Sequence, residues 1–96
     1  MVIRIVCINK DNGNHANPHE GITRFGWVYN GPNGPSTGYY SRTEMVAYLE
    51  RNNQAYVSNH GKTVYCFVNV SREGNKFVQT RADSDWSDNL LALGEC

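Results

Sequence analysis

The apolar positions of this chain follow the periods of both strands and helices. Residues 2–8 (VIRIVCI) are apolar on both alternating sets except at Arg4, and they are rich in β-branched side chains. Such a run is typical of a central strand with both faces largely covered. Further along, apolar and polar residues alternate over 55–58, 62–70 and 76–82, with turn residues between these stretches. This period of two predicts a three-stranded antiparallel meander.

The clearest helix start lies in SRTEMVAYLERNN, residues 41–53. Ser41 and Glu44 have the S-x-x-E spacing in which two side chains satisfy two free backbone N–H groups reciprocally. The spacing predicts the main helix of the domain, with an apolar stripe made of Met45, Val46 and Leu49.

A second, shorter helix is predicted over residues 17–26, NPHEGITRFG. Asn17 suits the N-cap, Pro18 the first helical position and Gly26 the left-handed position after the last turn. We expect the inner face of this helix to carry Ile22 and Phe25.

Residues 27–29 predict a short strand, and the following GPNGP is expected to be a loop because its prolines and glycines continue neither a strand nor a helix. Together these elements predict a single α+β domain over residues 1–96. We expect a mainly antiparallel sheet of about five strands, with one main helix and one short helix on one face.

Charge and hydropathy exclude several classes of partner. The nine Lys and Arg residues balance the nine Asp and Glu residues, whereas a phosphate-backbone binder normally carries a basic stripe, so extended nucleic acid is not an expected partner. The opening apolar run is short and contains Arg4, which is unlike a secretory signal, and no stretch is long and apolar enough to span a membrane. We expect a cytoplasmic protein.

The three cysteines, Cys7, Cys66 and Cys96, are an odd number without a paired spacing. From sequence we therefore expect reduced thiols, which fits the cytoplasm. Cys96 is interpreted as a semi-buried apolar residue, because no sequence neighbour would lower the pKa of its thiol.

Three stretches carry a family resemblance: IRIVCINKDNGNHANPHEGITRFGWV, SRTEMVAYL and FVQTRADSDWSDNLLALGEC. In this order they resemble a family of small bacterial and phage proteins, domain-of-unknown-function family 3892, over nearly the whole chain. The family typically closes on D-N-L-L-x-L-P-x-C, matched here by Asp88, Asn89, Leu90, Leu91, Leu93 and Cys96, with Gly94 in place of the proline. The resemblance implies no activity. It does imply that the three leucines dock on the core and close one edge of it.

Motifs for catalysis and for metal binding are missing from the sequence. It contains neither G-x-S-x-G nor H-E-x-x-H, so we expect no enzyme activity. His15 and His19 have H-x3-H spacing, but Asn-Pro interrupts it and no further ligands accompany it, so we predict neither a metal nor a cofactor.

A set of aromatic and arginine residues is more informative about binding. Taken singly, each is more typical of core or of solvated surface. Taken together, rings that stack on a base and guanidinium groups that grip phosphate or carboxylate favour a nucleotide-like ligand. The candidate ligand-binding residues are Arg24, Trp27, Tyr39, Tyr40, Arg42, Arg81 and Trp86.

The start of the main helix is the predicted centre of this site. Its free N–H groups attract anions, and Arg42 stands at the same end, one residue beyond the pair Tyr39 and Tyr40. Against this interpretation, Glu44 can occupy the same donors as the capping partner.

The sequence thus predicts a non-catalytic binding module for a small anionic, nucleotide-like molecule, working as a homo-oligomer. In a phage setting such a protein would sequester a host signal. The alternative is a protein-interaction module, or an inhibitor of a host protein, that uses exposed aromatic residues.

Overall fold

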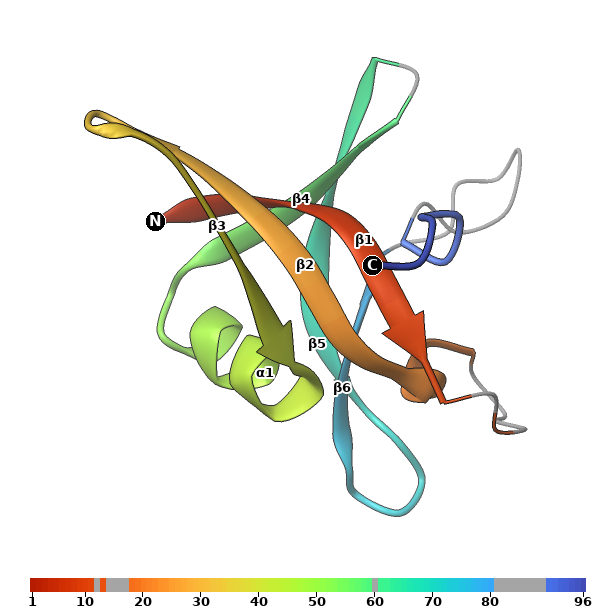
Figure 1. Ribbon diagram of the computed structural model, residues 1–96. Helices are drawn as coiled ribbons and strands as arrows, with labels where there is room; N and C mark the ends of the chain where they lie inside the picture. The colour runs from red at the N-terminus through yellow and green to blue at the C-terminus, as the bar shows by residue number, and fades with distance from the viewer. Residues whose placement is uncertain (12, 14–17, 60, 81–89) are drawn as a thin grey trace.

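The computed structural model describes residues 1–11, 13, 18–59, 61–80 and 90–96 (Figure 1). In chain order the elements are β1 (Val2–Lys10), the 3-10 turn η1 (Pro18–Gly21), β2 (Ile22–Gly31), β3 (Gly34–Ser41), α1 (Arg42–Glu50), β4 (Gln54–Asn59), β5 (Lys62–Val70) and β6 (Lys76–Thr80). The strands form one sheet in the order β3-β2-β1-β4-β5-β6. Neighbours in the sheet are antiparallel except β1 and β4, which are parallel. The predicted α+β class and the β4–β5–β6 meander are confirmed.

The sheet curls around a single core. Figure 1 shows β5 and β6 passing behind β1 and β2, with α1 beside them, and β6 contacts both α1 and η1. Buried side chains from β1, β2, α1, β4 and β6 form one cluster, which Leu90 joins. We call the side of the sheet that faces this cluster the inner face, and the opposite side the outer face.

Strand β1 is central, as predicted, but only its inner face is covered. Ile3, Ile5 and Ile8 are buried, whereas Val2 and Val6 are exposed. The step of three between Ile5 and Ile8 comes from a register shift, because Ile5 pairs with Trp27 and Cys7 with the adjacent Gly26. Val6 is the extra residue of this β-bulge, which turns Val6 and Cys7 to the same side of the sheet.

The short helix predicted over 17–26 was too long. Only Pro18–Gly21 form a 3-10 turn, and Ile22 already belongs to β2. Ile22 and Phe25 are both fully buried, as expected, but from a strand. At a second register shift Asn9 pairs with Arg24 and Lys10 pairs with Ile22, which leaves one extra residue in β2. The buried Ile22 and Phe25 are therefore three positions apart, a spacing that is also typical of a helix.

Strand β3 was not predicted. The Pro32–Asn33 turn does not end the sheet, because β3 pairs with β2 from Gly31–Gly34 to Arg24–Ser41. Its sequence, GPSTGYYS, has weak strand propensity, and it pairs only with β2. An edge strand tolerates proline and glycine that a central strand would not.

Helix α1 begins with the predicted capping box. Ser41 Oγ accepts from the Glu44 amide at 3.2 Å, and the Ser41 amide donates to Glu44 Oε1 at 2.9 Å. The chain leaves the helix through Asn52, whose φ of 65° is the left-handed conformation common just after a helix.

Tyr48 fixes the far end of α1 to the sheet. Its hydroxyl lies 3.0 Å from the carbonyl oxygens of both Met1 and Gln54, and shares one proton between them. Burial, with a smaller contribution from Tyr40 and Tyr29, raises the pKa of Tyr48 to about 12. In the part of the chain described here, no helix is long and apolar enough to cross a membrane.

Candidate functional site

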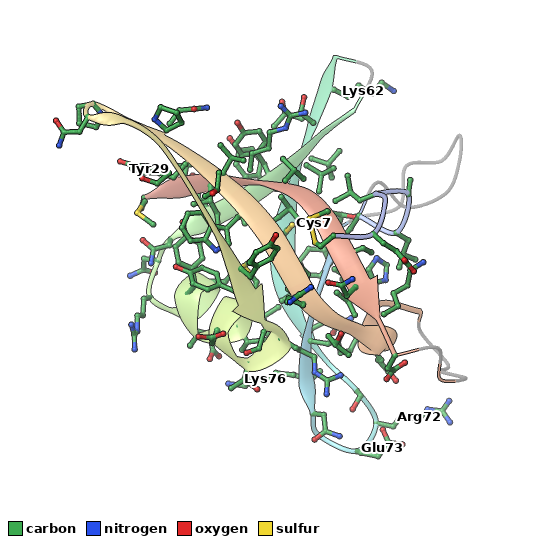
Figure 2. The ribbon with its side chains drawn as sticks, viewed as in Figure 1. Cys7, Tyr29, Lys62, Arg72, Glu73 and Lys76 are labelled. Atoms are coloured by element: carbon green, nitrogen blue, oxygen red, sulfur yellow. A yellow bond between two sulfur atoms is a disulfide. The ribbon has the colours of Figure 1, made fainter. Side chains whose placement is uncertain are left out.

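The outer face of β1 carries a disulfide between Cys7 and Cys96 (Figure 2). The bond joins residues 89 positions apart, whose Cα atoms lie 4.9 Å from each other. Residues 90–96, which we call the 90–96 segment, run alongside β1. The Ile8 amide donates to the Gly94 carbonyl at 3.1 Å, and the Cys96 amide donates to the Ile8 carbonyl at 3.2 Å. The segment therefore pairs with β1 at Ile8, beyond residues 2–4, where β1 pairs with β4.

The disulfide corrects two expectations from sequence. Cys7 and Cys96 are not reduced thiols, and Cys96 is exposed rather than semi-buried; Cys66 is not part of the disulfide. The bond also removes the support that reduced thiols lent to a cytoplasmic location. The disulfide could not be predicted from the spacing of the cysteines, because the two residues are far apart in the sequence. The parallel bridge between Ile8 and Glu95 places Cys96 beside Cys7 in the fold.

Gly26 makes room for the bond. A Cβ built on Gly26 would overlap Cys7 Sγ, would lie 3.0 Å from Cys96 Sγ and would touch the ring of Tyr39 at 3.4 Å. Because glycine has no side chain, both sulfurs can lie close to the backbone at this position. From sequence this glycine was interpreted as a helix end, so its role in the site was missed.

A groove of about 270 Å³ lies beside the disulfide on the outer face. Its surface comes from three adjacent strands, with lining residues Val6, Cys7, Gly26, Trp27, Val28, Thr37, Gly38 and Tyr39. The side chain of Tyr39 is 59% exposed at the groove. It therefore offers a ring face that is already held in place and still open to solvent.

Arg24 is held over Tyr39. Its guanidinium carbon lies 4.7 Å from the centre of the Tyr39 ring, within cation–π range. Its Nε donates to Asn9 Oδ1 at 2.8 Å, which fixes the plane of the guanidinium. The terminal nitrogens have no partner among the described residues. One sequence-predicted arginine and one sequence-predicted tyrosine thus meet on the outer face.

Arg4 adds a second positive charge to this face. It is exposed and pairs in register with Val28, which lines the groove. The six strands contain Arg4, Lys10, Arg24, Lys62 and Lys76 but no Asp or Glu. The charged side chains of the strands are therefore all positive, although the chain as a whole is neutral and Lys76 is paired with Glu50. Arg4 was not predicted as a binding residue, because a single arginine in an apolar strand carries no binding signal.

The side chains of Trp27 and Tyr40 pack against the core on the inner face, away from Arg24 and Tyr39, although Trp27 also contributes to the groove lining. Their ring centres are 5.2 Å apart, and Tyr40 lies 5.6 Å from Tyr48 of α1. Both residues pack against the core cluster, and the Trp27 ring also covers Gly38. Side chains alternate along β3, so the neighbours Tyr39 and Tyr40 point to opposite faces of the sheet. They therefore do not converge on one ligand, whereas the prediction from sequence placed them together.

Arg42 is not a free cation at the helix start. It is half-buried, and its Nη1 donates to the Glu20 carbonyl at 2.6 Å, which ties α1 to η1. The capping pair engages the amides of Ser41 and Glu44 at this helix end. The Arg42 guanidinium and the Glu44 carboxylate, both part of the predicted anion site, thus make internal contacts. Arg81 and Trp86, the remaining predicted site residues, lie outside the described residues.

Comparison with known proteins gives a family. The family described as protein of unknown function DUF3892 matches residues 4–94, nearly the whole chain. This chain is a member of the DUF3892 family. No curated protein and no solved structure matches it.

In this DUF3892 protein the family-like closing motif has a clear structural place. Leu90 is fully buried, Leu91 and Leu93 pack against the core, and Cys96 is bonded to β1. The expected docking of the leucines is confirmed. Through Cys96 the motif is bonded to Cys7, which lines the groove.

Proposed function

We propose that this DUF3892 protein is a non-catalytic binding protein for a small anionic molecule of the nucleotide class, held in the outer-face groove. The observation that carries the proposal is the pairing of an exposed ring with a fixed cation: Arg24 stands over Tyr39 at the groove. A flat ring of the ligand can stack in the apolar groove while its phosphate meets the guanidinium.

The size and lining of the groove narrow the ligand class. Pockets for drug-sized ligands hold roughly 300 to 1,000 Å³, so about 270 Å³ suits one base and its sugar rather than a dinucleotide. Arg4 lies on the same face and can meet a second anionic group. The eight lining residues include no histidine, lysine or carboxylate, which supports binding without chemistry on the ligand.

Native mass spectrometry of freshly purified protein, followed by titration calorimetry with AMP, GMP, CMP and UMP, tests this proposal. We expect one ligand per groove. Arg24→Gln should weaken binding by about one to two orders of magnitude, the usual loss for one charge-assisted hydrogen bond. Arg72→Gln is the matched control, because Arg72 is an exposed arginine in the β5–β6 turn (Figure 2). Equal losses in both variants, or no binding of any of the four nucleotides, would overturn the proposal.

A second candidate function is protein interaction through the outer face. Val2, Val6, Tyr39 and Tyr65 are exposed on this face, and Tyr65 also contacts Tyr56 with ring centres 6.1 Å apart. Exposed apolar side chains such as these can form an interface, including one between copies of the same chain. Tyr65 does not line the groove, so Tyr65→Ser separates the two candidates. Loss of self-association with unchanged nucleotide affinity would assign Tyr65 to a protein interface.

A further inference from the structure

The disulfide attaches the 90–96 segment covalently to β1. Two main-chain hydrogen bonds join the 90–96 segment to Ile8 of β1, and the Leu90 amide lies 3.4 Å from Thr80 Oγ1. Leu90 is fully buried in the core, while the side chains around it in the segment are half-buried or exposed. Short segments at the end of a chain can open locally at a lower free energy than the domain as a whole. The covalent bond adds to the hydrogen bonds and the leucine contacts that keep this segment against β1.

The two cysteines of the bond differ in how exposed each residue is. Cys96 is exposed, whereas Cys7 is half-buried on β1 beside Gly26 and Tyr39. An incoming thiolate attacks the sulfur that it can reach, and the other sulfur leaves. The geometry therefore makes Cys96 the attacked sulfur and Cys7 the leaving group.

We propose that Cys7–Cys96 is a thiol–disulfide exchange site at which a dithiol reductant releases the 90–96 segment from β1. One thiolate of the dithiol attacks Cys96 Sγ, the bond between the protein sulfurs breaks, and Cys7 leaves as a thiolate. The second thiolate of the dithiol then attacks the mixed disulfide and displaces the Cys96 thiolate. The dithiol is oxidised by two electrons to its cyclic disulfide, and the protein cystine is reduced to two thiols.

Release of the segment changes the groove as well as the β1 edge. It frees the Ile8 amide and carbonyl, whose partners belong to the segment, and it removes the Cys96 sulfur from its place against Cys7 and near the Tyr39 ring. Cys7 and Tyr39 both line the groove. Reduction is thus expected to weaken ligand binding. This last step rests on the proposed function, whereas the exchange chemistry and the release do not.

The test uses the full chain with Cys66→Ala, which removes the other cysteine and prevents disulfide shuffling. Oxidised protein is incubated with glutathione, quenched in acid, digested and mapped by mass spectrometry. We expect glutathione on Cys96 and a free thiol on Cys7. Glutathione on Cys7, or reaction only in denaturant concentrations that unfold the whole domain, would overturn the proposal.

Hydrogen exchange before and after dithiothreitol tests the release. Peptides that contain Ile8 and Cys96 should lose protection by about tenfold or more, while peptides from β5 and β6 keep theirs. Unchanged protection, or loss of protection along the whole chain, contradicts a local release. AMP calorimetry on the same two samples tests the coupling, with an expected loss of about tenfold in affinity on reduction. If AMP binds neither sample, the proposed function fails while the exchange site stands on its mapping.

Discussion

Replacing Gly26 with alanine is the sharpest test of how the sheet and the disulfide fit together. The new methyl group would overlap Cys7 Sγ and approach Cys96 Sγ to 3.0 Å. Both sulfurs are tied to the β1 backbone or to the segment beside it, so neither can swing away as the end of a flexible side chain could. Either the strands move apart or the disulfide fails to close.

The two responses set the limits of the expected destabilisation. Overpacking that the strands absorb costs about 1 to 3 kcal/mol. Loss of a bond that joins residues 89 positions apart costs about 4 to 5 kcal/mol in the chain-entropy description. For a domain of this length, 1 kcal/mol lowers the melting temperature by roughly 4 to 8 °C. We therefore expect Gly26→Ala to melt well below the parent.

The assay combines denaturant unfolding with thiol counting in unfolded protein. The parent should show only the Cys66 thiol, because Cys7 and Cys96 are bonded. Gly94→Ala is the matched control, since a Cβ there meets no atom within 4 Å. In a background of Cys7→Ala with Cys96→Ala, the cost of Gly26→Ala should shrink, because the clashing sulfurs are gone. The reasoning is refuted if Gly26→Ala forms the bond fully and melts with the parent, or if its cost is the same without the sulfurs.

Three further perturbations follow from single contacts. Leu90→Ala should lower the free energy of unfolding by about 2 to 5 kcal/mol, measured by denaturant titration, because Leu90 is fully buried. The raised pKa of Tyr48, about 12 against an ordinary 10.0, means that stability present below pH 10 is lost as pH rises toward 12, by about 2 to 3 kcal/mol. In unfolding curves taken at successive pH values, Tyr48→Phe should reduce the decrease in the free energy of unfolding at alkaline pH. Tyr39→Phe, which changes an exposed ring, should leave that decrease unchanged. Arg42→Ala should cost about 1 to 2 kcal/mol through its lost bond to a backbone carbonyl, whereas Arg51→Ala, at an exposed position, should leave the melting curve unchanged.

Sequence patterns within single elements were sufficient to predict α1, β1, β4, β5 and β6. The capping box of Ser41 and Glu44 placed α1 correctly, because both partners lie within one turn of each other. The apolar run of β1 and the period-two stretches of β4, β5 and β6 were found for the same reason, since each pattern repeats within its own strand. The docking of Leu90 was indicated by the family-like closing motif rather than by any local propensity.

The candidate site was less accessible from sequence. Arg24 and Tyr39 were both named, but as members of a larger set whose other described members lie elsewhere. Tyr39 and Tyr40 adjoin in sequence, and only the assignment of residues 34–41 to a strand shows that they point to opposite faces. That strand has few residues of strand propensity and exists because β2 offers it a partner.

The α+β class, the capping box at the start of α1 and the strands β1, β4, β5 and β6 could be predicted from the sequence alone. These features depend on contacts within a few positions. Tertiary structure alone decided the two β-bulges of the β1–β2 pair, the edge strand β3, the Cys7–Cys96 bond over Gly26 and the gathering of Arg4 and Arg24 on one face. Each of these joins residues that are distant along the chain, and register between strands, which no local pattern specifies, determines which of them meet.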